Sequence, residues 1–373
     1  MPVIPTIRSV GTAVPPHRIS QEIHFTILES ANGLSRAEKL QLRQVYHRSG
    51  IEFRHSVLSE FGSADKEDNV LFHPANLQPP LPVSGRMDLY QQYAADLSER
   101  AIRECFDALP SVSYAQVTHL ITFSCTGMSA PGLDIQLVEK LGLNRNVERT
   151  CINFMGCYAG INALKVAYHI VRSQPDAVVL LAGVELCTLH YQKNEKQDQV
   201  IANALFADGA AACIVTASDI EPAGSFPGLA IRDFYAEFEP AGMDEMIWSI
   251  GDFGFNLRLS MEVPDVIRKN INSLMQKLWK KAGISQQDIV FYAIHPGGKK
   301  ILEACEEALQ LSRDQNEISY RVLRDFGNMS SVTVFFVLKE HLKSLTHADS
   351  GKKILACAFG PGLTMEAMIA EVC

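Results

Sequence analysis

The segment Asn153–Gly160 places Cys157 where the pattern of a strand changes into the pattern of a helix. Residues 147–153 have the composition of a short strand. The helix is expected over about 158–173, from apolar residues at helical spacing: Ile161, Leu164, Ala167, Tyr168 and Val171. Gly156 permits the sharp turn between the two elements. A unit of this kind is typical of α/β folds, in which reactive groups lie on loops at strand ends.

The position of Cys157 favours chemistry at its thiol. A thiol at the start of a helix faces unpaired backbone N–H groups and the positive end of the helix dipole. Both stabilise the thiolate, which is the nucleophilic form. A cysteine among apolar residues is otherwise more often a small core residue. The choice between these two readings therefore depends on what the rest of the chain supplies.

Two further segments place polar side chains at element boundaries. The apolar run 289–294 has the length of a strand and ends at His295, which precedes a Pro-Gly-Gly turn. Asn328 lies in a polar turn ahead of an apolar helix over about 332–342. Alone, the histidine could be a hydrogen-bonded structural residue and the asparagine a helix cap. Together with Cys157, they predict a site where a thiolate is acylated and its oxyanion is stabilised.

Composition excludes several classes of protein. The chain is 47% hydrophobic and 20% charged, which is ordinary for a globular protein. No apolar run approaches the ~20 residues of a membrane span and no signal peptide is evident, so we expect no stable membrane insertion. Nine cysteines without Cys-x-x-Cys spacing argue against a disulfide framework or a zinc site, and they predict a reducing cytoplasm. The net charge of −8 argues against nucleic acid as a partner.

Further motifs accompany the three polar residues along the chain. They are Ala204-Leu-Phe-Ala-Asp-Gly-Ala-Ala-Ala212, Gly254-Phe255, Val263-Pro264 and Ala358-Phe-Gly-Pro-Gly-Leu-Thr364, preceded by the opening segment Ile7–Pro15. In this order, the set resembles the signatures of type III polyketide synthases, the chalcone and stilbene synthase superfamily. The resemblance covers essentially the whole chain. A single motif would carry little weight, whereas the ordered set is specific.

The resemblance implies an α/β protein with a thiolase-like fold. Five layers, αβαβα, would be built from two similar βα halves around one active site. We expect an N-terminal half at 1–222, which carries the cysteine and a helical and loop insert at about 21–88. A C-terminal half at 223–373 would carry the histidine and the asparagine.

Two segments are expected to lack regular structure. The segment 220–228 is rich in proline and glycine, and it is the natural seam between the halves. Within the insert, His55 to Pro82 contains serine, aspartate and proline, and we expect an exposed irregular loop there.

The resemblance also implies a reaction. Cys157 would attack an acyl-CoA starter, release coenzyme A and hold the acyl group as a thioester. His295 within hydrogen-bond reach would favour a thiolate–imidazolium pair. Malonyl-CoA would then lose carbon dioxide, and the enolate oxygen would accept hydrogen bonds from His295 and from the Asn328 amide. Coenzyme A thioesters are the substrates, and no metal or other cofactor is expected.

Further binding residues follow from the same resemblance. Phe206 would place an apolar ring beside the malonyl carboxylate and favour its loss, unless it is a plain core aromatic. Arg43 and Arg48 share a predicted helix and fall where the family places basic residues against the coenzyme phosphates. A solvated helix face would explain the same two arginines. Gly297 and Gly298 would let the pantetheine arm approach the backbone.

The pocket departs from the plant chalcone-forming pattern. Cys125, which precedes Thr126, stands at a position where that pattern has a threonine, and so do Cys187 and His190. Leu257 stands where a gatekeeping phenylalanine is expected, whereas Ser330 matches a small polar lining position. The segment 248–255 resembles the microbial branch instead. Small or aliphatic lining residues would leave room for an acyl chain longer or less aromatic than coumaroyl. We therefore expect a fatty acyl starter and a resorcinol or pyrone product.

Other readings stay open at this point. A synthase that uses malonyl-CoA alone and makes a tetrahydroxynaphthalene-type product also carries pocket cysteines, as Cys125 and Cys187 would be. A single-round condensing enzyme similar to ketoacyl synthase III shares the three polar residues. A non-catalytic acyl-CoA-binding protein would not need them.

A homodimer is expected from the resemblance. The segment Thr126–Pro131 aligns with the loop that reaches toward the neighbouring subunit's pocket in the family. Ala130 is smaller than its plant counterpart, so the wall between the two pockets should be less intrusive.

Overall fold

The computed structural model describes residues 3–31, 35–62, 70–71, 81–192, 197–217 and 227–373. Its centre is a nine-stranded mixed sheet with the strand order β11-β12-β13-β8-β1-β7-β6-β4-β5. The strands are β1 (Pro5–Ala13), β4 (His119–Ser124), β5 (Glu148–Asn153), β6 (Val179–Leu186), β7 (Asp208–Ala217), β8 (Leu229–Phe238), β11 (Ile289–Ile294), β12 (Lys353–Gly360) and β13 (Thr364–Val372). The strand predicted before the cysteine turn and the strand predicted before the histidine are thus present, as β5 and β11.

The sheet folds over into two layers that meet where β1 pairs with β8. On one side of this junction, β4 runs parallel to both β5 and β6, and on the other β11 runs parallel to β12. The remaining neighbours are antiparallel. Each layer therefore contains a parallel unit whose strand ends can carry reactive groups on the same edge.

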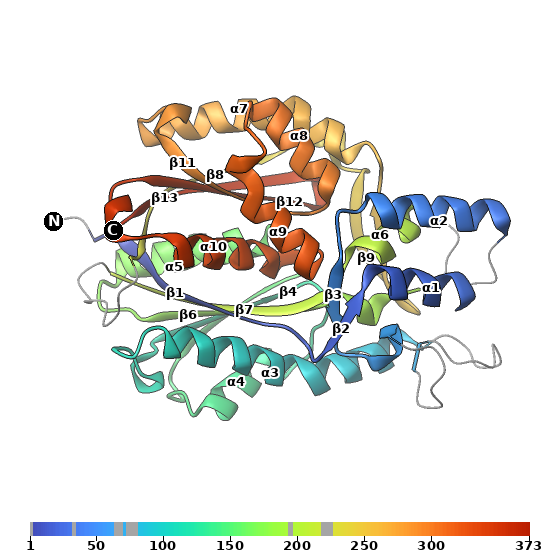
Figure 1. Cartoon of the computed structure of the whole chain (residues 1–373). Helices are drawn as coiled ribbons and strands as arrows, with labels where there is room; N and C mark the ends of the chain where they lie inside the picture. Colours follow the sequence, from blue (N-terminus) through green and yellow to red (C-terminus); the bar gives the residue numbers. More distant parts are fainter. Residues whose placement is uncertain (1–2, 32–34, 63–69, 72–80, 193–196, 218–226) are drawn as a thin grey trace.

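Helices form the other three layers (Figure 1). On the outside, α3 (Val83–Asp107) and α4 (Leu133–Leu141) cover one sheet layer, and α7 (Val263–Ala282) and α8 (Lys299–Leu309) cover the other. Between the sheet layers lie α5 (Ala159–Ser173) and α10 (Thr333–Ser344), with α9 (Glu317–Phe326) beside them. This is the five-layered αβαβα arrangement that the sequence predicted.

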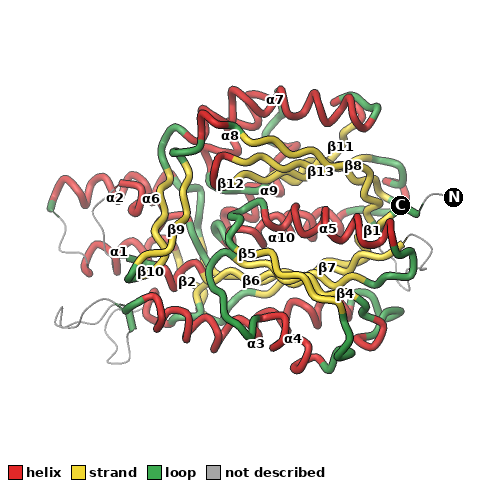
Figure 2. Tube along the Cα trace, turned by 180° about the vertical axis from the view of Figure 1, so that it is seen from behind, coloured by secondary structure: helices red, strands yellow, loops and turns green. Residues whose placement is uncertain are grey.

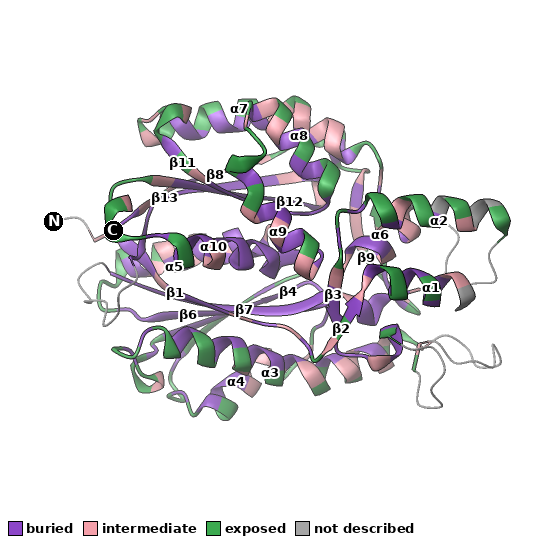
Figure 3. Cartoon of the chain, in the orientation of Figure 1, coloured by how far each residue is buried: buried purple, intermediate pink, exposed green. Residues whose placement is uncertain are grey.

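Burial explains why α5 and α10 take the central layer. Ala163, Leu164 and Ala167 of α5 are fully buried, as are Phe335 and Leu338 of α10. Figure 3 shows buried residues concentrated in these helices and in the strands on both sides. A helix that is apolar around most of its circumference is stable only when it is covered on all sides. The strands β6 and β7 are likewise buried along their whole length, which accounts for their largely apolar sequences.

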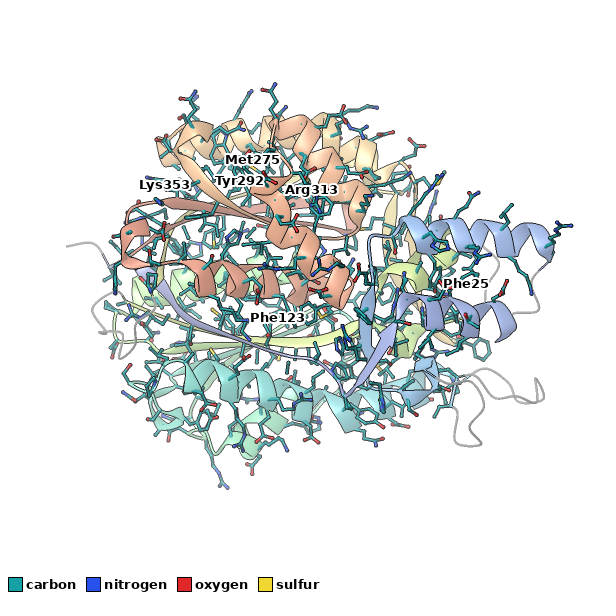
Figure 4. The ribbon with its side chains drawn as sticks, in the orientation of Figure 1. Phe25, Phe123, Met275, Tyr292, Arg313 and Lys353 are labelled. Carbon is teal, nitrogen blue, oxygen red and sulfur yellow. The ribbon has the colours of Figure 1, made fainter. Side chains whose placement is uncertain are left out.

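Large side chains fill the spaces between layers (Figure 4). Phe123 of β4 stacks on Phe335 of α10 with 5.6 Å between ring centroids. In the opposite layer, Met275 of α7 and Tyr292 of β11 belong to one buried apolar cluster. Among the described residues, no helix combines the length and the hydropathy that a bilayer span requires.

A group of short elements gathers at one end of the layers, opposite the two termini (Figures 1 and 2). They are β2 (His17–Ser20), α1 (Gln21–Ala31), α2 (Arg36–Arg48), β3 (Phe53–Ser56), the 3₁₀ helix η1 (Ser59–Gly62), the 3₁₀ helix η3 (Cys187–His190), α6 (Gln197–Leu205), β9 (Met246–Gly251) and β10 (Gly254–Leu259). Part of this group is the insert that was expected at about 21–88.

The prediction of an exposed loop from His55 to Pro82 is wrong at its start. Residues 55–56 end β3 and residues 59–62 form η1, and His55 and Phe61 are 7% and 1% exposed. Polar groups of this segment are satisfied inside the protein: Ser56 Oγ lies 2.8 Å from Thr188 Oγ1, and the Val57 N–H donates to Asp208 Oδ2 at 2.9 Å. Residues 63–69 and 72–80 lie outside the described part of the chain. So does most of the expected seam, at 218–226, and the division into halves at residue 222 stays a prediction.

Candidate active site

One cavity is lined by all three residues that the sequence singled out, Cys157, His295 and Asn328. Cys157 lies between β5 and α5, His295 follows β11, and Asn328 follows α9. The cavity has an empty volume of about 970 Å³, within the range of small-molecule sites. Three segments that are distant in the sequence thus meet at one concave surface.

A sharp turn holds Cys157 in place. Gly156 has φ +85°, and a Cβ atom there would lie 2.1 Å from Pro361 Cδ, so only glycine fits. Two other residues near the nucleophile, Phe154 and Ser330, also have positive φ, at 62° and 49°. Left-handed backbone at residues other than glycine is uncommon and concentrates at functional sites.

Cys157 is a neutral thiol in this structure. Burial raises the pKa of its thiol to about 12, although hydrogen bonding with Ser330 and Asn328 opposes the shift. The thiol donates to Ser330 Oγ at 3.6 Å. The expectation that the helix start would favour the thiolate is therefore wrong for this state. Loss of solvation at this buried site, together with the nearby charge of Glu185, outweighs the helix dipole.

His295 carries a neutral imidazole and lines the same cavity. Its side chain is 1% exposed, and burial lowers the pKa of its imidazole to about 3. Neither ring nitrogen has a hydrogen-bond partner among the described residues. The expected thiolate–imidazolium pair is thus absent here, because neither charge would be solvated in the cavity. The backbone fixes the residue, since the His295 N–H donates to the Cys357 carbonyl at 2.8 Å.

The side-chain amide of Asn328 has a defined orientation. Its Nδ2 donates to the Gly297 carbonyl at 3.1 Å, and its Oδ1 accepts from the Ser330 N–H at 2.8 Å. An amide nitrogen carries two N–H groups, and the second faces Cys157, whose pKa this hydrogen bond lowers. Asn328 therefore presents a donor, not an acceptor, at the nucleophile.

Phe206 and Asn328 are joined through their backbones. The Asn328 N–H donates to the Leu205 carbonyl and the Ala207 N–H donates to the Asn328 carbonyl, both at 2.9 Å. The ring of Phe206 lines the cavity. A shift of one residue is consequently transmitted to the other.

Arg54 is a buried residue that the sequence reasoning missed. It is 1% exposed and donates to the carbonyls of Phe206 at 2.7 Å and Asn203 at 2.9 Å, and also to that of Ala204. Its remaining N–H groups bind Gln21 Oε1. Arg54 thus caps the C-terminal end of α6, directly before Phe206. No local pattern indicates this, because the carbonyls lie about 150 positions away in the sequence.

Glu185 was missed as well. It is fully buried at the end of β6 and accepts hydrogen bonds from the Cys125 N–H at 3.0 Å, from Thr126 Oγ1 at 2.8 Å and from Ser331 Oγ. Burial raises the pKa of its carboxyl group. The sequence could have indicated this residue, because Glu185 lies in an otherwise apolar strand. A glutamate in such a strand is buried only when hydrogen-bond donors or opposite charges surround it.

The predicted pocket residues all line the cavity: Cys125, Thr126, Cys187, His190, Leu257 and Ser330. Their contact with a substrate stays a prediction. His190 is already saturated, since Nε2 donates to the Thr126 carbonyl at 2.6 Å and Nδ1 accepts from the Phe255 N–H at 3.1 Å. It stacks on the Phe255 ring with centroids 3.9 Å apart, and burial lowers its pKa to about 3. His190 is therefore a neutral lining residue of the cavity.

A second cavity adjoins the first, and Leu259, Gly297 and Ile301 line both. Its empty volume is about 1040 Å³. Arg48 and Gly298 line it, as predicted for the coenzyme site, together with two basic residues that were not singled out, Lys299 and Lys300.

Arg43 does not share this position with Arg48. Five residues along an α-helix correspond to about 140° around its axis, so the two side chains point in different directions. The Arg43 guanidinium lies 5.9 Å from the centroid of the Phe25 ring. Arg43 is not among the residues that line the second cavity, and its expected place beside the coenzyme stays a prediction.

Comparisons with known proteins cover the whole chain. Residues 4–219 match the family model of chalcone and stilbene synthases, N-terminal domain, and residues 233–373 match that of the C-terminal domain. The alpha-pyrone synthesis polyketide synthase-like Pks18 of Mycobacterium tuberculosis is 29% identical over 339 residues, which are 91% of this chain and 84% of that protein. Type III polyketide synthase 21 of Oryza sativa subsp. japonica is 30% identical over 370 residues, with 97% and 92% covered. The crystal structure of PKS-I from the brown alga Ectocarpus siliculosus has a TM-score of 0.91 and 30% identity, with 100% and 99% covered.

Proposed function

The chain belongs to the chalcone and stilbene synthase family of type III polyketide synthases, with their thiolase-like fold, and we propose that it extends a fatty acyl-CoA starter with malonyl-CoA. The starter is loaded on Cys157, extended by repeated decarboxylative condensation and cyclised to a resorcinol or pyrone. The observation that carries this proposal is the meeting of Cys157, His295 and Asn328 in one cavity of about 970 Å³.

Loading begins from a neutral thiol and a neutral imidazole. Cys157 Sγ attacks the thioester carbonyl of the starter while its proton passes to the unprotonated ring nitrogen of His295, which has no hydrogen-bond partner among the described residues. The C–S bond to coenzyme A then breaks, and the imidazolium returns the proton to the departing thiolate. The acyl group remains on Cys157 as a thioester. The ion pair exists only during this exchange, when each charge compensates the other.

Extension uses the same donors. When malonyl-CoA loses carbon dioxide, the electron pair of the broken C–C bond forms an enolate whose charge lies on the thioester oxygen. The Asn328 Nδ2–H and an N–H of His295 donate to that oxygen. The apolar ring of Phe206 solvates the malonyl carboxylate poorly and so favours its loss. The enolate carbon then attacks the acyl thioester, and Cys157 leaves as thiolate.

The second cavity suits the coenzyme. Arg48, Lys299 and Lys300 line it and are cationic, although the chain carries a net charge of −8. Anionic phosphates would thus be held by a local basic mouth. The shared wall residues Gly297 and Ile301 place this mouth next to the catalytic cavity.

The choice of starter rests on the lining. Cys125, Cys187 and Leu257 are small or aliphatic, which leaves space for a methylene chain. The mycobacterial relative named for alpha-pyrone synthesis supports a pyrone product. The two pocket cysteines equally favour a second candidate, synthesis from malonyl-CoA alone. Two relatives that align with more than 90% of this chain are named polyketide synthases, which makes a single-round condensing enzyme the weaker hypothesis.

We also propose that the synthase is a cytoplasmic homodimer. The strand β5 forms one edge of the nine-stranded sheet, and five of its six residues are exposed. An open edge with exposed side chains can pair with the same strand of a second copy. All nine cysteines are free thiols, which fits a reducing compartment.

The test is a panel of acyl-CoA starters with isotopically labelled malonyl-CoA, followed by mass analysis of the products. We expect long-chain starters to give products that contain one starter and more than one labelled malonyl-derived unit. Products from malonyl-CoA alone, with no starter incorporated, would favour the second candidate. Absence of any condensation with every starter would contradict both.

A further inference from the structure

Residues of the insert line part of the active-site cavity, and one of them is a histidine that no step above uses. We call the part lined by His24, Phe61, Tyr191, Gln199 and Asn203 the insert branch. His24 lies on α1, is 2% exposed, and its ring centroid is 5.4 Å from that of Phe61. The cavity that contains the nucleophile is therefore also lined by a buried polar side chain of the insert.

Hydrogen bonds fix the orientation of the His24 ring. Nδ1 lies 3.0 Å from the Tyr46 hydroxyl, which donates to the Asn203 carbonyl at 3.3 Å. Because a carbonyl can only accept, the hydroxyl proton is used there, and Nδ1–H donates to the Tyr46 oxygen. This assigns the lone pair of the ring to Nε2.

Nε2 has no hydrogen-bond partner among the described residues. Burial and the nearby Arg54 charge hold the pKa of His24 well below its usual range, so the ring stays a neutral acceptor. A buried acceptor without a partner is unfavourable, and a ligand that donates to it gains a hydrogen bond without displacing another. A plain methylene chain would leave this atom unsatisfied.

We propose that the insert branch binds a hydroxyl group of the acyl chain attached to Cys157, through an O–H donated to His24 Nε2. The inference rests on the proposed function, since it requires a chain on Cys157. Two sources supply such a group: a starter that carries a hydroxyl, or an enol of the carbonyls that malonyl extension adds. Ala202 and Phe61 provide apolar wall for the methylenes that lead to it.

Two substitutions at His24 test the contact. His24→Leu removes the acceptor and keeps an apolar side chain, whereas His24→Gln keeps a hydrogen-bonding end. We measure kcat/KM for two acyl-CoA starters of equal length, one with a terminal hydroxyl. His24→Leu should lower the ratio of hydroxylated to plain starter about tenfold, and His24→Gln should retain most of it. Ile23→Gln, at an exposed neighbour on the same helix, is the matched control and should leave the ratio unchanged.

The two sources give different results. If the hydroxyl belongs to the starter, only the starter ratio changes; if it is an enol, His24→Leu also shortens the products made from the plain starter and labelled malonyl-CoA. Equal losses for both starters in both His24 variants would show a structural role and overturn the inference, as would no change in ratio or product length. A wild-type protein that extends no starter would instead overturn the proposed function.

Discussion

Replacing Arg54 by methionine should both destabilise the protein and slow its chemistry. Arg54 donates to four oxygen acceptors in the interior, those of Gln21, Asn203, Ala204 and Phe206. Ala204 also accepts from Gln21 Nε2 at 2.9 Å, and Asn203 from the Tyr46 hydroxyl at 3.3 Å. Among the described residues, Arg54 is the only donor to the Phe206 carbonyl and to Gln21 Oε1. The substitution therefore leaves two buried acceptors unsatisfied.

Each unsatisfied buried acceptor costs about 1–3 kcal/mol, so Arg54→Met should lower the free energy of unfolding by about 2–6 kcal/mol. The chemistry should suffer as well, because the Phe206 segment is hydrogen-bonded to the backbone of Asn328. A displacement of a catalytic donor by about 1 Å reduces rates by up to about a hundredfold. We expect kcat for malonyl-CoA decarboxylation to fall by about ten- to a hundredfold, with KM changing less.

The assay combines urea denaturation with decarboxylation measured at a temperature where the variant is folded. Arg54→Lys, which keeps the charge and three donors, should recover part of both losses. Arg18→Met is the control, since Arg18 is an exposed residue that stacks on Phe53. A folded Arg54→Met protein with wild-type kcat would refute the positioning role, and a loss of stability below about 1 kcal/mol would refute the burial argument.

Three further outcomes follow from the same geometry. Cys187→Phe should lower kcat/KM for a long fatty acyl-CoA by about ten- to a hundredfold through overpacking, with acetyl-CoA affected far less; equal losses would show that residue 187 does not face the chain. Between pH 6.5 and about 3, the unfolded state protonates His295 while the folded state does not, so stability falls as the pH falls. His295→Asn should therefore weaken the pH dependence of the unfolding free energy by about 1.4 kcal/mol per pH unit, and an unchanged slope in urea titrations would contradict its neutral burial. Light scattering should give twice the monomer mass of 41.2 kDa, and a monomer at micromolar concentration would contradict pairing at β5.

Local sequence patterns predicted the positions of the reactive groups because each lies at the end of a periodic element. The turn at Gly156 and the Pro-Gly-Gly turn after His295 have short-range signatures. The ionisation states did not follow, since they depend on burial, which the sequence around Cys157 does not encode. The helix dipole was visible in the sequence, whereas the loss of solvation was not.

Long-range contacts account for the other omissions and errors. Arg54 and Glu185 act through partners in distant segments, so no spacing rule indicates them. The polar composition of residues 55–62 predicts an exposed loop. In the structure, buried residues of distant segments replace water as the hydrogen-bond partners of this segment. The helix predicted to carry Arg43 and Arg48 is present. The two side chains lie about 140° apart around its axis, and only Arg48 lines the second cavity.

The most direct test of the account is the intact mass of the protein after incubation with a labelled acyl-CoA. We predict that wild-type protein gains one acyl group and releases one coenzyme A, and that Cys157→Ala gains none. Cys157→Gln, which retains the His295 and Asn328 donors, should still decarboxylate malonyl-CoA without elongating a starter. An acyl adduct on Cys157→Ala would contradict the assignment of the nucleophile and, with it, the proposed mechanism.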